Sequence, residues 1–105
     1  MMWPFRKDHG ACGLKRDPNW RYLAKGFLLH FPCCAVCGKK DGVVPHHMIP
    51  FHVDRRRELN VDNLIPLCPD HHLWFGHLGL WQSWNPDVLF DCGLWRTKIE
   101  GRPTV

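Results

Sequence analysis

Two closely spaced pairs of metal-ligand residues constrain the fold of this chain more than any other feature. Cys34 and Cys37 form the first pair, within CAVCG, and Cys68 and His71 form the second, within CPDHH. Each pair has the two-residue gap that lets both side chains reach one tetrahedral ion from a tight turn. Together the pairs predict a Cys₃His structural Zn²⁺ site, and the alternative is buried cysteines that bind no metal.

The cysteines also bear on the cellular compartment. The first residues, MMWPFRKDHG, lack an apolar signal region, and no run approaches the roughly 18 apolar residues of a membrane span. We therefore expect a cytoplasmic protein with no membrane partner, in which thiols stay reduced and closely spaced cysteines bind zinc. Cys33 offers a second spacing to Cys37, Cys12 and Cys92 are expected to be free thiols, and a secreted, disulfide-rich domain is the alternative.

The length of 105 residues predicts one domain over 20–105, preceded by an irregular basic arm over 1–19. Apolar periodicity and proline positions predict the following elements in order: a helix from Trp20 to before Pro32, a strand from Val43 to the histidines, a polar loop over 51–62, a strand over 64–67 and a helix from Pro69. This order indicates a small α+β fold.

The tail contains one further helix signal and several large aromatic residues. Asn85 is a predicted N-cap with Pro86 in the first turn, and the helix is expected to end at Leu89 or Cys92. We expect four aromatic side chains to cover the small core, with base stacking as the minority alternative: Trp81, Trp84, Phe90 and Trp95.

Adjacent histidines on the first strand raise a geometric difficulty. Successive strand residues point to opposite faces, so His46 and His47 can act in one site only at a bent strand end or with the reacting phosphate between them. Otherwise one of the two is a packing histidine.

The histidines of the following helix divide between two sites. His71 and His72 leave a helix about 100° apart, so His71 is expected to face the cysteines and His72 to face His46. His77 reaches the same cation as His72 only if the helix breaks near Gly76.

Positive charge indicates where a polyanion would bind. The formal net charge is +4 and the pI is about 8.9, a mild basic bias. Arg55, Arg56 and Arg57 are consecutive, and are either a solvated loop or phosphate contacts beside the site. The same two readings apply to the basic residues of the arm, which are Arg6, Lys7, Lys15 and Arg16.

Taken together, the segments CAVCG, HHMIP, NLIPLC and CPDHH resemble the HNH nucleases, also called the ββα-metal or His-Me finger family, in their zinc-bracketed, small stand-alone phage or bacterial form. The resemblance covers about residues 34–77, the motif core of the expected domain. It implies an α+β fold with a ββα-metal core, a Cys₃His structural zinc and flanking helices.

The resemblance also implies roles for individual residues. His47 falls at the general base that deprotonates the attacking water, and Asn63 at the asparagine that ties the loop to the hairpin and orients that base. His46 and His72 fall at the ligands of one catalytic divalent cation, with His77 as a second-rank ligand. Because His46 replaces a common aspartate, Mg²⁺, Mn²⁺, Ni²⁺, Co²⁺ and Zn²⁺ are all candidate cations.

The function that these implications predict is a metal-dependent DNA endonuclease or nickase of low sequence specificity, acting in the cytoplasm of a bacterial cell or a phage-infected host. Expected partners are DNA and either a second copy of the chain or a phage packaging protein. The alternative is a catalytically inactive, zinc-stabilised DNA-binding or assembly module.

Overall fold

The computed structural model describes residues 15–100 as a small α+β fold. Its elements in order are α1 (Trp20–His30), β1 (Val44–His47), the 3₁₀ turns η1 (Arg55–Arg57) and η2 (Val61–Asn63), β2 (Leu64–Leu67), α2 (Pro69–His71), the π-helix η3 (His72–Gly76) and α3 (Val88–Glu100). Most of the predicted basic arm, with Arg6, Lys7 and Cys12, lies outside the described residues.

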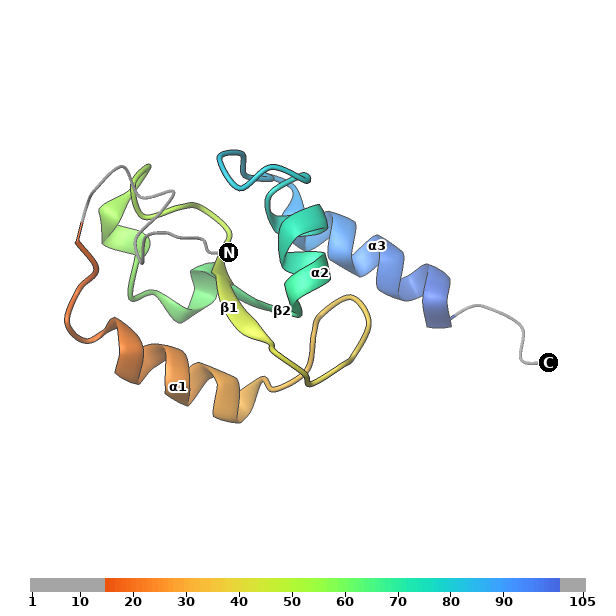
Figure 1. Cartoon of the computed structure of the whole chain (residues 1–105), viewed down its shortest axis with the longest axis horizontal. Coiled ribbons are helices and arrows are strands. Elements are labelled where there is room, and N and C mark those ends of the chain that lie inside the picture. Colours follow the sequence, from red (N-terminus) through yellow and green to blue (C-terminus); the bar gives the residue numbers. More distant parts are fainter. Residues whose placement is uncertain (1–14, 101–105) are drawn as a thin grey trace.

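A two-stranded antiparallel hairpin is the centre of the fold (Figure 1). β1 pairs with β2 so that His46 lies opposite Ile65 and His47 opposite Leu64. Neighbouring residues of a strand point to opposite faces, and here one face of β1 meets α1 while the other meets η3. The hairpin therefore presents its two histidines to two different helices.

The helix predicted from Trp20 is confirmed as α1. The Asp17 carboxylate accepts the N–H of Asn19 at 2.8 Å, and the Asp17 carbonyl accepts the N–H of Trp20 at 2.9 Å, which fixes the turn that starts the helix. Phe27 is the buried residue that anchors the helix. The helix ends at His30, close before Pro32, as the backbone restrictions around proline require.

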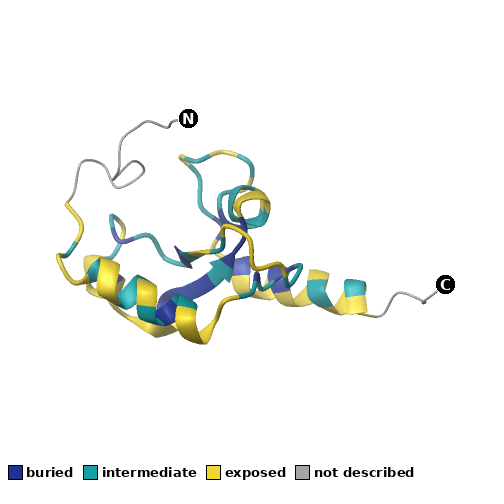
Figure 2. Cartoon of the chain, turned by 60° about the horizontal axis from the view of Figure 1, so that its bottom comes forward, coloured by how far each residue is buried: buried dark blue, intermediate teal, exposed yellow. Residues whose placement is uncertain are grey.

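The core lies where the hairpin, the cysteine turn and α3 meet, and its residues are among the buried, dark blue segments of Figure 2. Its buried side chains are Cys34, Val36, Ile65, Leu67, Cys68, Val88 and Cys92. Two of them, Cys34 and Cys68, belong to the predicted zinc set. Packing of this small core therefore depends on the same residues that would bind the metal.

The last helix differs from its prediction. Asn85 accepts the N–H of Asp87 at 2.9 Å, but this turn precedes the helix, and α3 runs from Val88 to Glu100. Val88 and Cys92, one turn apart, are buried in the core and hold the first half of the helix. The second half continues into solvent, where an ion pair over four residues and other local contacts support it.

The expectation that four aromatic residues cover the core is wrong for Phe90, which is 70% exposed because its side of α3 faces away from Val88 and Cys92. Trp95 lies on the same side as Val88 and Cys92 and packs on Phe75 with ring centres 6.1 Å apart, but it is still 40% exposed. Trp81 and Trp84 are half-buried in the loop before α3. No helix within residues 15–100 combines the length and the apolar character that crossing a bilayer demands.

Candidate metal centres and active site

Cys34, Cys37, Cys68 and His71 come together as the sequence predicted, with their ligand atoms all within 4.8 Å of one another. The His71 Nδ1 atom lies 3.3 Å from the sulfur of Cys68 and 3.6 Å from that of Cys34, and the sulfurs of Cys37 and Cys68 are 3.9 Å apart. Ligands of a tetrahedral zinc ion stand about 3.3–3.8 Å from one another, given its usual bond lengths. This Cys₃His cluster is therefore positioned to bind zinc.

A tight turn prepares the first pair of ligands. The Cys34 N–H donates to the Lys39 carbonyl and the Gly38 N–H donates to the Cys34 carbonyl, at 2.8 and 2.9 Å. Gly38 has a φ of +79°, which a residue with a side chain rarely adopts. This turn selects Cys34 and Cys37 for the cluster, and Cys33, which offered the alternative spacing, is not one of its members.

The surroundings of the cluster shift the pKa values of two of its thiols. Burial opposes ionisation of Cys34, but backbone N–H groups, foremost that of Cys37, donate to its sulfur and lower its pKa to about 6. Burial, with a smaller effect of neighbouring Cys34, raises the pKa of Cys68. Cys34 is therefore disposed to be a thiolate, the form that binds zinc, whereas ionisation of Cys68 is favoured when a positive ion lies beside it.

His46, His72 and His77 form a second group, called here the three-histidine cluster, with ligand nitrogens within 4.8 Å of one another. The centre of the His46 ring lies 5.0 Å from the ring centres of His72 and of His77, and the Nε2 atoms of His72 and His77 are 3.2 Å apart. Three imidazoles thus surround one point. The structure brings His77, which the sequence left open, to the same place as the other two.

A π-helix explains how His77 reaches the cluster. His72 and His77 are five residues apart, so their side chains would point in different directions on an α-helix but lie close together on the wider turn of the π-helix η3. η3 ends at Gly76, and the Nδ1 atom of His77 then donates to the Ser83 carbonyl at 2.7 Å. Since a neutral imidazole carries one proton, this bond leaves the lone pair on Nε2, which faces His72.

His46 provides the observation that most favours a cation at this cluster. It is 3% exposed, and among the described residues its Nε2 atom is buried without a hydrogen-bond partner. Burial, followed by the nearby His72 and His77, lowers its pKa to about 2. A neutral, buried imidazole nitrogen with no protein partner is costly unless a metal ion satisfies it.

His47 lies on the other face of the strand, with its Nε2 atom 2.9 Å from the Glu58 carbonyl and its ring 4.5 Å from that of Trp20. Because a carbonyl only accepts, Nε2 carries the proton and Nδ1 keeps the lone pair. Burial is the main cause that lowers the pKa of His47 below its ordinary value. Its imidazole is therefore neutral at pH 7 and able to accept a proton at Nδ1.

One cavity of about 130 Å³ resolves the difficulty of the adjacent histidines. It is lined by His46 and His47 from the two faces of β1, by His72 and His77, and by Arg16. The cavity wraps around the end of the short strand, so a single bound group can meet both sides of it.

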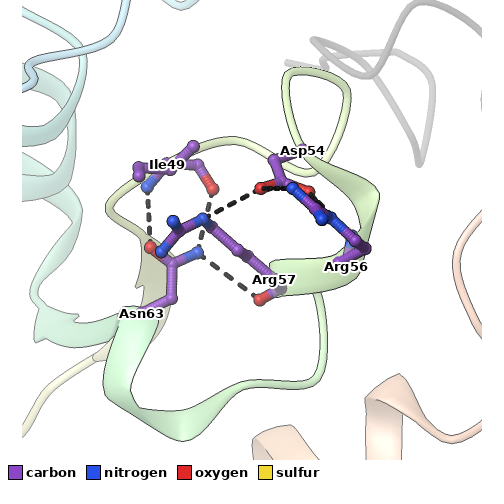
Figure 3. Close-up of polar contacts among 5 residues, drawn as sticks. All are labelled: Ile49, Asp54, Arg56, Arg57 and Asn63. Carbon is purple, nitrogen blue, oxygen red and sulfur yellow. Dashed lines mark hydrogen bonds and ion pairs between the residues drawn. The ribbon is translucent and has the colours of Figure 1, made fainter.

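Asn63 clamps the loop to the hairpin, as Figure 3 shows. Its Oδ1 atom accepts the N–H of Ile49 at 2.9 Å, and its Nδ2 atom donates to the carbonyls of Ile49 at 2.9 Å and Arg57 at 3.4 Å. The side chain is buried, so these bonds are made out of water. The clamp therefore fixes the backbone at Arg57, the residue before Glu58, whose carbonyl contacts His47.

The three consecutive arginines lie on the surface and are paired with acidic neighbours. The Nε atoms of Arg56 and Arg57 each lie 3.0 Å from the Asp54 carboxylate (Figure 3), which lowers the pKa of that carboxyl to about 2. Arg55 contacts the Glu58 carboxylate and the Lys15 carbonyl. None of the three lines the cavity, and the Arg56 side chain is 90% exposed.

Several residues that hold the site were missed by the sequence reasoning. The Glu58 carbonyl orients His47, the Ser83 carbonyl orients His77, and a Cβ atom at Gly76 would fall 2.9 Å from the His46 ring. The first two act through backbone atoms, which leave no signal in residue type. Trp81, which packs on His72 and His77 with ring centres 5.1 and 4.9 Å away, was expected in the core instead.

Comparison with known proteins agrees with this geometry. The family model described as HNH endonuclease matches residues 34–73, from the first cysteine of the Cys₃His cluster to just beyond His72. Searches of curated proteins and of solved structures each give no match. The matched segment holds the predicted zinc ligands, both strands, His47 and Asn63, and it is this part of the chain that is similar to the HNH endonuclease family.

Proposed function

We propose that this protein is a metal-dependent DNA endonuclease with His47 as its general base. The observation that carries the proposal is the cavity that His47 shares with the three-histidine cluster. Proteins of the HNH family generally hydrolyse DNA, which supports phosphodiester hydrolysis here. A cluster of metal-ligand side chains next to a neutral base is what metal-assisted hydrolysis requires.

His47 would take a proton from the attacking water at Nδ1. The hydrogen bond from Nε2 to the Glu58 carbonyl holds the required tautomer and continues to accept once the ring is charged. Trp20 packs on the ring and fixes its plane. Because the pKa of His47 is lowered, the ring is available as a base at neutral pH.

His46, His72 and His77 would hold one divalent cation. When bound, such an ion supplies positive charge to the scissile phosphate and to the leaving oxygen. Three imidazole nitrogens suit Mn²⁺, Co²⁺, Ni²⁺ and Zn²⁺ better than they suit Mg²⁺, which prefers oxygen ligands. We therefore propose activation by several transition metals.

The surface around the site fits a DNA backbone better than it fits a particular base sequence. The net charge is +4, and Arg55, Arg56 and Arg57 lie exposed on the loop that Asn63 clamps. Contacts of arginine with phosphate position DNA without reading its sequence. We propose low sequence specificity, and since one cavity cuts one strand, a single copy would nick.

Relaxation of supercoiled plasmid tests the proposal. Zinc-loaded wild type should nick the plasmid with at least one of Mg²⁺, Mn²⁺, Co²⁺ or Ni²⁺, and His47→Ala should lower the rate about 100-fold or more, the usual contribution of a general base. His30→Ala is the matched control, since His30 is exposed at the far end of α1.

Two results would contradict the proposal. Cleavage that survives His47→Ala would refute the assignment of the base. No cleavage by wild type with any of these metals, together with binding of the plasmid, would favour the inactive DNA-binding module.

A further inference from the structure

Arg16 reaches the active-site cavity from the segment that precedes α1. It lines the cavity together with His47 and the three-histidine cluster. Its guanidinium carbon lies 4.7 Å from the centre of the Phe51 ring and 4.8 Å from that of Trp20. Two aromatic side chains from separate parts of the chain thus determine where this positive charge stands.

The same two rings flank the proposed base. His47 lies 4.5 Å from the Trp20 ring and 6.0 Å from the Phe51 ring. Stacking engages the faces of a guanidinium, whereas its N–H donors lie in its plane and point outward from its edge. The two rings therefore contact the faces of the Arg16 guanidinium and hold it in the cavity that His47 also lines.

A fixed cation at this place has a chemical consequence. A cation held by the three-histidine cluster would bring a second positive charge into the cavity that Arg16 lines. Positive groups held close together are unfavourable unless an anion lies between them. A phosphodiester carries one negative charge and two non-bridging oxygens, which match the donor geometry of a guanidinium.

We propose that Arg16 binds a non-bridging oxygen of the scissile phosphate. The proposal rests on the proposed function and narrows its substrate: the cavity recognises the phosphodiester group itself, whatever is attached to it. Arg55, Arg56 and Arg57, outside the cavity, would then meet phosphates further along the strand. Small phosphodiesters without bases should accordingly be substrates.

The test compares Arg16→Ala with Arg21→Ala in the full zinc-loaded chain. Arg21 is a matched control because it is exposed, its guanidinium lies 4.9 Å from the Tyr22 ring, and it does not line the cavity. Each variant removes one positive charge and one stacked arginine. The substrates are bis(p-nitrophenyl) phosphate, which contains one phosphodiester and no base, and supercoiled plasmid.

Arg16→Ala should lower kcat/KM about 10- to 100-fold on both substrates, the range for loss of a hydrogen bond between charged groups. Arg21→Ala should stay close to wild type on the small substrate. Added ethylguanidinium at low millimolar concentration should restore part of the activity of Arg16→Ala, because Trp20 and Phe51 still form its binding place. It should not affect Arg21→Ala.

Three outcomes would overturn the proposal. Equal activity of the two variants would show that Arg16 has no special role. A loss on plasmid alone would place Arg16 at a distant phosphate. A loss on both substrates with a lowered melting temperature and no rescue by ethylguanidinium would make it a structural residue.

Failure of the proposed function would look different. Wild type would then hydrolyse neither substrate with any metal, and the fluorescence anisotropy of a short labelled DNA duplex would still test Arg16. Arg16→Ala must weaken binding more than Arg21→Ala does; equal weakening would overturn the phosphate contact.

Discussion

Adding one methyl group at Gly76 should damage the three-histidine cluster while leaving the Cys₃His cluster intact. Gly76 ends η3 and packs against the ring of His46, where an added Cβ atom would lie 2.9 to 3.1 Å from three ring atoms. Ordinary contacts of a Cβ atom begin at 3.4 Å, so the ring must move by about 0.5 Å (3.4 minus 2.9). His46 is 3% exposed, and its ring is enclosed by Gly76, His72 and His77, so it has little room to move.

Crowding of this kind costs about 1–3 kcal/mol. If the cost falls on the geometry that binds the cation, the affinity of the three-histidine cluster for Co²⁺ falls about 5- to 150-fold. Gly93→Ala is the control, because Gly93 lies within α3 and an added Cβ there has nothing within 4 Å. That change should leave Co²⁺ binding unaltered and stabilise the fold by up to about 1 kcal/mol, the helix propensity difference.

Calorimetric titration of the zinc-loaded proteins with Co²⁺ measures the effect. Elemental analysis should find one zinc ion per chain in wild type, Gly76→Ala and Gly93→Ala alike. An affinity of Gly76→Ala within twofold of wild type, with zinc content unchanged, would refute the inference that the His46 ring is a ligand held in place by Gly76.

Three other predictions concern the clamp, the zinc and the base. Asn63→Ala should lower the free energy of unfolding, measured in urea, by about 1–3 kcal/mol, because it leaves the Ile49 N–H without its acceptor. Replacement of the exposed helix-capping residue Asn60 by Ala should lower it by about 1 kcal/mol or less. Equal decreases would contradict the role of Asn63 as a clamp. Chelation of zinc should abolish the cooperative melt seen by circular dichroism, because Cys34 and Cys68 are also core residues, and an unchanged melt after confirmed zinc loss would argue against this. The single-turnover cleavage rate should fall as the pH is lowered, with a midpoint below the ordinary histidine pKa of 6.5, because burial lowers the pKa of His47 and the base acts only when unprotonated. A midpoint at or above 6.5 would count against His47 as the base.

The zinc cluster and the hairpin could both be predicted from the sequence, because both follow from local residue spacing. A two-residue gap between Cys34 and Cys37 has few geometric solutions, and short apolar runs bounded by prolines and charges delimit β1 and β2 well. The alternation of side chains along a strand likewise predicted that His46 and His47 lie on opposite faces.

The rest depended on features that residue types do not encode. η3 is a π-helix, which no simple sequence periodicity predicts, so the sequence could not place His77. Nor could it indicate that Gly76 packs against the His46 ring. α3 extends to Glu100 although few of its residues contact the core, so its apolar pattern suggested an earlier end. Arg16 reaches the cavity through long-range packing on Phe51, which sequence spacing cannot indicate.

We propose that the chain holds two different metal ions, a structural one at the Cys₃His cluster and a catalytic one at the three-histidine cluster. Crystals of the zinc-loaded protein soaked in a cobalt salt, with anomalous diffraction recorded at the cobalt and zinc edges, test it most directly. We expect zinc among Cys34, Cys37, Cys68 and His71 and cobalt among His46, His72 and His77. Cobalt found only at the cysteines, or no second ion beside His46, would show that the three-histidine cluster is not a metal site.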